Sequence, residues 1–193
     1  YFRTDHHWTA LGAYYAYRSF AELKGISPVE LSQCEKKEFS GFLGAFYSDT
    51  NKNPALTQNP DTVVAYVPPG TIKMQYTDKE GNTFDWPLIS DVSNWAASSK
   101  YSTFIGGDNP YTVIQNAGLT DGSSCLVIKE SFGNAFIPYL AANYQTVHVI
   151  DYRYWNGNIP EFVKSNNIQD VLFLNNVSAT RNASLVGKME SLT

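Results

Sequence analysis

The chain has 193 residues, and we expect a single domain over 1–193 because this length suits one large core. Only 17% of its residues are charged and the net charge is −4, which argues against the basic footprint of a nucleic-acid-binding protein. Aromatic residues make up 15% of the chain, which suits an aromatic-lined groove for sugars and equally suits aromatic packing. No apolar run approaches the ~18 residues of a membrane-spanning helix.

The first long element predicted is an amphipathic helix that starts after Thr9. Gly25 is its expected stop, because glycine is the common residue just beyond a helix C-terminus. A second helix is predicted to start at S-P-V-E (27–30), which combines a capping serine, a proline in the first turn and a capping-box glutamate. The residues expected on the buried face of the first helix are Ala13, Ala16, Tyr17, Phe20 and Leu23.

The middle of the chain, about 39–118, is rich in turns and short strand-like runs. T-V-V-A-Y-V (62–67), T-I-K-M-Q-Y (71–76) and T-F-D-W (83–86) are such runs, and D-K-E-G-N (78–82) between the last two is typical of a hairpin. We therefore expect an antiparallel, β-rich insertion that forms a lid or a wall.

The last third of the chain carries the clearest architectural signal. Three nearly continuous apolar runs, C-L-V-I-K (125–129), T-V-H-V-I-D (146–151) and V-L-F-L-N (171–175), alternate with segments of helical pattern at 135–143 and 160–166. Strands that are buried on both faces have this composition, and their alternation with helices predicts a parallel sheet with right-handed crossovers. The predicted fold class is α/β, a parallel sheet flanked by helices.

The opening motif T-D-H-H-W-T (4–9) holds two of the three histidines of the chain beside an acid. Asp5 lies two residues before His7 at the entrance of a helix, so its carboxylate can reach the Nδ1–H of the ring while Nε2 points outward at a hydroxyl. Two alternatives stay open at this point. The run can be a metal site, or three polar residues that open a helix, since aspartate caps helices.

A partner for this motif is expected at Ser131 in K-E-S-F-G-N-A-F (129–136), between the first buried strand and a helix. Functional residues gather at the carboxyl ends of strands in open α/β sheets, and backbone N–H groups there, such as that of Gly133, can stabilise an oxyanion. If the sheet has the common 2-1-3 order, Asn175 or Asn176 would face the serine and complete the hole. The alternatives are a serine that only caps its helix and asparagines that only end a strand.

Together, T-D-H-H-W-T (4–9) and E-S-F-G-N (130–134) resemble the DHHW family. That family is similar to the alginate O-acetyltransferase group of the SGNH-like hydrolases, which have a flavodoxin-like α/β fold. The resemblance implies that Ser131 is the nucleophile, His7 the general base and Asp5 its orienting acid. It also implies that an asparagine after the third strand helps to hold the oxyanion.

Two features depart from the usual SGNH pattern. Lys-Glu precedes Ser131 where Gly-Asp is usual, and the acid–histidine pair comes before the serine, as the permuted acetyltransferase group has it. The glycine of the second SGNH block has no clear match, although D-Y-R-Y-W-N-G (151–157) occupies its loop. Within that loop, Arg153 is a candidate for binding an anionic or sugar group.

The resemblance implies a serine-dependent carbohydrate O-acetyltransferase or esterase that acts on cell-surface or exported polysaccharide and needs no metal or organic cofactor. We expect an extracytoplasmic location, with any export signal outside this sequence. We also expect a fragment of a longer protein, since Tyr1 and Phe2 resemble the end of a strand or loop. The alternative is a catalytically inactive carbohydrate-binding domain of the same fold. A metal-dependent phosphoesterase is a weaker rival, because hard-metal sites need several clustered carboxylates that the sequence does not offer.

Overall fold

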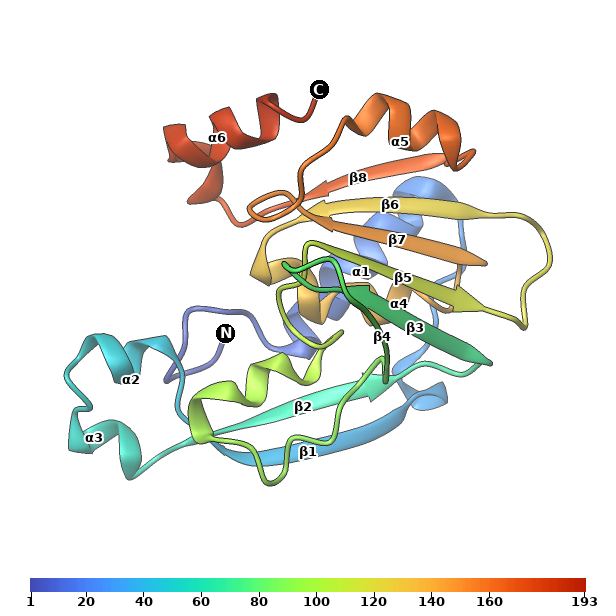
Figure 1. Cartoon of the computed structure of the whole chain (residues 1–193). Coiled ribbons are helices and arrows are strands. Elements are labelled where there is room, and N and C mark those ends of the chain that lie inside the picture. Colours follow the sequence, from blue (N-terminus) through green and yellow to red (C-terminus); the bar gives the residue numbers. More distant parts are fainter.

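The computed structural model describes all 193 residues and contains two sheets (Figure 1). A six-stranded sheet has the spatial order β4-β3-β5-β7-β6-β8, and a separate ribbon pairs β1 with β2. The strands are β1 (Glu35–Phe42), β2 (Asp61–Val67), β3 (Ile72–Thr77), β4 (Thr83–Trp86), β5 (Tyr111–Asn116), β6 (Ser124–Lys129), β7 (Thr146–Asp151) and β8 (Asp170–Leu174).

The central strands have the predicted 2-1-3 order. β6 lies between β7 and β8 and is parallel to both, so the carboxyl ends of all three strands meet at one edge of the sheet. The crossovers contain α4 (Ile137–Leu140), which is shorter than the predicted segment 135–143, and α5 (Ile159–Ser165), which matches the predicted segment 160–166 to within one residue.

The three strands of the last third are parallel as predicted, and the antiparallel middle segment, which was expected to form a lid or a wall, extends the same sheet. β5 pairs antiparallel with β7, β3 with β5, and β4 with β3 across the predicted 78–82 hairpin. A short hairpin can join only antiparallel neighbours, which explains the direction of β4 relative to β3. The run at 62–67 leaves this sheet and pairs with β1 instead.

Helices cover both faces of the sheet, and the alternation of side chains along β6 divides the core in two. Cys125 and Val127 face the larger cluster, which α1 (Ala10–Lys24), α4 and the β1–β2 ribbon complete. Leu126 and Ile128 face the smaller cluster, which α5 and the chain around Leu192 cover. Every residue of β6 is buried, which explains its nearly continuous apolar sequence.

The first helix begins and ends where the sequence predicts. The Thr9 hydroxyl accepts from the Gly12 N–H, and Gly25 adopts φ +66° just after Lys24. Leu23 is nevertheless 87% exposed, because the buried stripe follows Ala10, Ala13, Tyr14, Tyr17 and Ala21. The second helix was wrongly placed: Glu30 and Gln33 do form a capping box, but they cap only one 3-10 turn, Leu31–Gln33.

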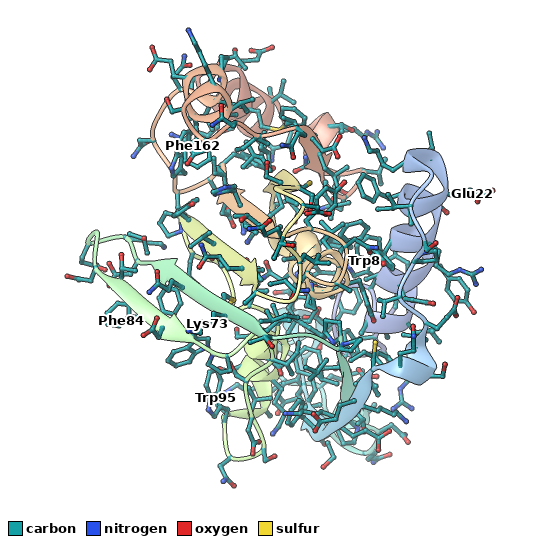
Figure 2. The ribbon with its side chains drawn as sticks, turned by 90° about the vertical axis from the view of Figure 1, so that its right-hand side faces the viewer. Trp8, Glu22, Lys73, Phe84, Trp95 and Phe162 are labelled. Atoms are coloured by element: carbon teal, nitrogen blue, oxygen red, sulfur yellow. The ribbon has the colours of Figure 1, made fainter.

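The remaining helices are peripheral. α2 (Ala45–Asp49) and α3 (Pro54–Thr57) lie between β1 and β2, and α6 (Ala183–Glu190) follows β8 (Figure 1). Figure 2 shows Phe162 of α5 at one end of the molecule, and Lys73 and Phe84 of the β3–β4 hairpin on the side away from Glu22 of α1. Cys34 and Cys125 are both free thiols. None of the helices combines the length and apolar character needed to cross a bilayer.

Replacing Ile128 by Ala is expected to destabilise the domain by about 2–5 kcal/mol, because this fully buried side chain joins the sheet to α5. The matched control is Val171→Ala on β8, where the side chain is 43% exposed and the expected change lies within about 0.5 kcal/mol. Urea unfolding followed by circular dichroism measures both. Equal effects of the two substitutions would contradict the assignment of β6 as the centre of the core.

Candidate active site

The opening motif forms a loop that is tied to the β1–β2 ribbon before α1 begins. The Asp61 carboxylate, at the start of β2, accepts hydrogen bonds from the Thr4 N–H and the Thr4 hydroxyl, both at 2.7 Å. The Phe46 N–H donates to the Thr4 carbonyl from the far side, and the Phe2 N–H donates to the His7 carbonyl. These bonds fix the backbone from which the acid and the imidazoles project.

Asp5, His7 and Ser131 form a continuous hydrogen-bonded chain. Oδ1 of Asp5 lies 2.5 Å from Nδ1 of His7, and Nε2 of His7 lies 2.8 Å from Oγ of Ser131. The last contact joins residues 124 positions apart in the sequence. An imidazole that is held by a carboxylate on one nitrogen and faces a hydroxyl on the other has the arrangement of an activated nucleophile.

Asp5 is almost completely enclosed and stays ionised. Burial alone would raise its pKa, but hydrogen bonds from the His7 ring, the Ala45 N–H and the His7 N–H outweigh burial and lower the pKa from 3.8 to about 2. Gly44 is required beside this carboxylate, because a Cβ there would lie 2.2 Å from Oδ2 of Asp5. The carboxylate can therefore hold the ring in one orientation throughout the neutral pH range.

Ser131 lies directly beyond the carboxyl end of β6, where the sequence predicts it. It is the first residue of a 3-10 helix, Ser131–Ala135, and Glu130 caps that helix by accepting from the Phe132 N–H. The structure offers no acceptor for the backbone N–H of Ser131 itself. This donor lies on the nucleophile residue, where a developing oxyanion can use it.

Tyr101 contacts both His7 and Ser131, and no sequence pattern indicated this role. Its ring stacks on the His7 imidazole, with centroids 4.0 Å apart and planes 14° apart, and its hydroxyl donates to the Ser131 carbonyl at 3.1 Å. Burial raises the pKa of Tyr101 well above its ordinary value, so the phenol remains a donor. Tyr101 belongs to a 3-10 segment of the insertion, Ala97–Thr103, which no sequence motif connects with the opening loop.

The backbone N–H of Gly133 is not available to an oxyanion, contrary to the prediction. It donates to the Glu130 carbonyl at 2.9 Å and closes the first 3-10 turn. The glycine is needed for another reason: a Cβ at this position would lie 2.6 Å from Cβ of Lys129. Its role is therefore to allow the tight return of the chain after Ser131.

Asn175 and Asn176 follow β8 beside the serine loop, but neither side chain donates to it. Nδ2 of Asn175 points to Sδ of Met189 at 3.9 Å, while its Oδ1 is buried without a partner. Oδ1 of Asn176 accepts from the Ser178 N–H in a turn, and its backbone N–H donates to Glu130. Asn176 is thus connected to the serine loop through its backbone, rather than through the amide that the resemblance implies.

Arg153 belongs to a partly buried charge cluster, in which it pairs with two carboxylates and is not a free cation. It lies 2.6 Å from Asp151 and 2.8 Å from Asp108, and Lys129 contacts the same two carboxylates at 3.0 and 3.2 Å. Burial would raise the pKa of Asp108, but the two cations lower it to about 2. Lys129 thus anchors the end of β6 to the end of β7.

A groove of about 510 Å³ opens next to the pair. One wall consists of aromatic rings from the opening motif and from Phe132, and the indole Nε1 of Trp8 fixes that wall by donating to the Phe132 carbonyl at 2.8 Å. The other wall is the chain that follows β8. The residues that line the groove are Tyr1, His6, Trp8, Phe132, Leu174, Asn175, Asn176, Val177 and Ser178.

His6, between Asp5 and His7 in the motif, is exposed. Its ring packs against those of His7 and Phe132, with centroids 4.2 and 6.0 Å apart. Asp5, His6 and His7 each offer one possible metal-ligand atom, and these atoms lie within 4.8 Å of one another. Asp5 already bonds to His7, and His7 bonds to Ser131, so a metal here would compete with the hydrogen-bonded chain.

The comparison with protein families agrees with the motif. A family model described as DHHW protein matches residues 1–150. The chain belongs to the DHHW family. A search of curated proteins gives no match.

Two solved proteins have similar structures. A DHHW family protein from Eubacterium siraeum is 33% identical with a TM-score of 0.89; the match covers 100% of this chain and 64% of that one. PatB1 of Bacillus cereus, in its structure with a sulfonyl adduct, is 23% identical with a TM-score of 0.76 over 96% of this chain and 63% of that one. This chain therefore spans less than two thirds of either protein, and the likeness to PatB1 shows a related fold.

Replacing Asp5 by Asn is expected to destabilise the protein at neutral pH and to matter less in acid. Because the folded-state pKa of Asp5 is lowered to about 2, its contribution to stability is present above the unfolded value of 3.8 and is lost as the pH falls through 2. Urea unfolding of both proteins at pH 6, 4, 3 and 2 measures the difference. A difference in the free energy of unfolding that stays constant over this range would contradict the assignment.

Proposed function

We propose that this DHHW protein is a serine-dependent esterase or O-acyltransferase that acts on acyl groups of a polysaccharide. The observation that carries the proposal is the 2.8 Å contact between His7 Nε2 and Ser131 Oγ, with Asp5 on the other ring nitrogen. Neither a lone capping serine nor a polar helix entrance needs such a contact. PatB1, which has a related fold, carries a sulfonyl adduct in its structure.

In the proposed reaction, His7 takes the proton of Ser131 while Oγ attacks the acyl carbonyl carbon. Asp5 keeps Nδ1 protonated and stabilises the positive ring that forms. The ring then gives its proton to the departing alcohol, which leaves an acyl group on Ser131. Water or a sugar hydroxyl, deprotonated by His7, attacks the acyl-enzyme and releases the product.

Negative charge develops on the carbonyl oxygen in both steps. The Ser131 N–H, which has no acceptor within the protein, is the donor best placed to meet it. A second donor is available if the Asn175 amide turns away from Met189, where its present contact is long and weak. This rotation would remove only one poor hydrogen bond.

The groove favours a carbohydrate over a charged ligand. Its aromatic wall offers faces on which sugar rings can stack, and Asn176 and Ser178 on the other wall offer polar groups for hydroxyls. None of the lining residues is Lys, Arg, Asp or Glu. A polysaccharide substrate agrees with the expected extracytoplasmic location. A catalytically silent sugar-binding domain could use the same groove, so the proposal must be tested through the serine.

Replacing Ser131 by Ala is expected to lower hydrolysis of a chromogenic acetyl ester by at least about 10³-fold, because the acyl-enzyme can no longer form. Wild type should also be inactivated by a sulfonyl fluoride, with one sulfonyl group added at Ser131, as mass spectrometry would show. Equal turnover by the two proteins, or none by either, would favour the binding domain. A loss of wild-type activity on adding a chelator would favour a metal enzyme.

Replacing Tyr101 by Phe is expected to lower kcat about fivefold, since one hydrogen bond of about 1 kcal/mol to the Ser131 carbonyl is lost and the ring stack stays. Tyr101→Leu should lower kcat further, because the support of the imidazole is lost as well. Steady-state kinetics on the acetyl ester separates kcat from KM. If Phe and Leu behave alike, the stacked ring does not position His7.

A further inference from the structure

Glu130 is a buried carboxylate that touches the nucleophile and has no part in the reaction described above. Its residue is only 4% exposed. Oε1 accepts from the Asn176 N–H at 2.9 Å, and Oε2 accepts from the Phe132 N–H at 3.3 Å. Oε2 also lies 3.2 Å from Oγ of Ser131, in a geometry that accepts the hydroxyl proton.

The serine hydroxyl thus has one proton and two acceptors. His7 Nε2 is 2.8 Å away and Glu130 Oε2 is 3.2 Å away. When the proton points to His7, the ring is a free base and the serine is ready to attack. When the proton points to Glu130, Oγ has no proton left for His7. A hydrogen bond between Oγ and His7 then requires a proton on Nε2, so that the ring donates. The ring then carries protons on both nitrogens and cannot act as the base.

We propose that Glu130 is a positioning residue that sets the pH range of this site by stabilising the resting arrangement, in which His7 carries two protons and Ser131 donates to Glu130. The inference rests on the proposed function. The negative carboxylate of Glu130 stabilises the doubly protonated, positive ring, with the serine hydroxyl between them. A higher pH is therefore needed to remove the second proton and make the site active.

Two ionisable groups that touch the ring keep their charge states over the working range. Asp5, on the same loop, has a pKa of about 2, and burial raises the pKa of Tyr101, which stacks on the ring, well above 10. Behind Tyr101, Asp108 is neutralised by Lys129 and Arg153. His6 packs beside the ring.

On the side of Glu130, burial raises the pKa of the Tyr152 phenol to about 12, and the carboxylate adds to this rise. These groups, and His6, are the same in wild type and in a Glu130 variant. A difference between their pH profiles therefore reports on Glu130.

Replacing Glu130 by Gln removes the charge and keeps the size of the side chain. The doubly protonated ring loses its negative partner, so the active form persists to lower pH. We expect the acid-side midpoint of kcat/KM to move down by about 0.5–1 pH unit. Gln keeps one acceptor oxygen in place of two, so a hydrogen bond to Asn176 or to Phe132 is weakened; that structural effect lowers kcat at every pH and leaves the midpoint in place, which separates it from the proposed role.

The experiment measures two rates between pH 4.5 and 9: acetyl ester hydrolysis and inactivation by a sulfonyl fluoride. In the second reaction, Ser131 Oγ bonds to sulfur, fluoride leaves and His7 takes the proton, so this rate reports on the nucleophile without a sugar substrate. Wild type, Glu130→Gln and Glu130→Asp are compared. The matched control is Glu161→Gln, which removes an exposed charge in the first turn of α5 and should leave the profile unchanged.

Each outcome decides between the proposals. A lower midpoint in Glu130→Gln for both rates supports the inference. An active wild type with the same midpoint in Glu130→Gln overturns it and leaves the proposed function intact, whereas an unreactive wild type overturns both. If a thermal melt shows that Glu130→Gln does not fold, Glu130→Asp decides. Its shorter side chain withdraws from the serine, so a smaller downward shift is expected, and an unmoved midpoint overturns the inference.

Discussion

The candidate site depends on one long-range constraint, which is that the opening loop must reach the carboxyl end of β6. A hydrogen bond between His7 and Ser131 joins residues 124 positions apart. The conformational entropy lost in closing that loop is offset by contacts outside the pair. Asp61 holds the loop through hydrogen bonds to Thr4, and the ring of Tyr101 stacks on the His7 imidazole. The β1–β2 ribbon and the insertion thus act as the support of the site.

The electrostatics of the site follow from the same burial. Three carboxylates lie near the pair, and each is satisfied differently: Asp5 by the ring and by backbone N–H groups, Asp108 by two cations, and Glu130 by two backbone N–H groups and the serine. Of the three, only Asp5 and Glu130 form hydrogen bonds with the His7–Ser131 pair. They lie at its opposite ends, so one orients the base while the other competes for the hydroxyl proton.

Membership of the DHHW family and the structural likeness to PatB1 support the architecture over nearly the whole chain. The site differs from the pattern that the resemblance implies in its oxyanion donors. The Gly133 N–H donates to the Glu130 carbonyl within a turn, and the Asn176 side chain accepts from the Ser178 N–H in another turn. Substrate binding would therefore have to recruit Asn175, or the Ser131 N–H would act alone.

The sequence by itself determined the pieces that depend on local chemistry: the first helix with its Thr9 cap and Gly25 stop, the buried strand before Ser131, and the pairing of Asp5 with His7 two residues later. Only the tertiary structure decided which distant groups meet. The antiparallel half of the sheet, the stacking of Tyr101 and the contact of Glu130 with Asn176 join segments far apart in the chain. No local pattern encodes such contacts, because they arise from how whole elements pack.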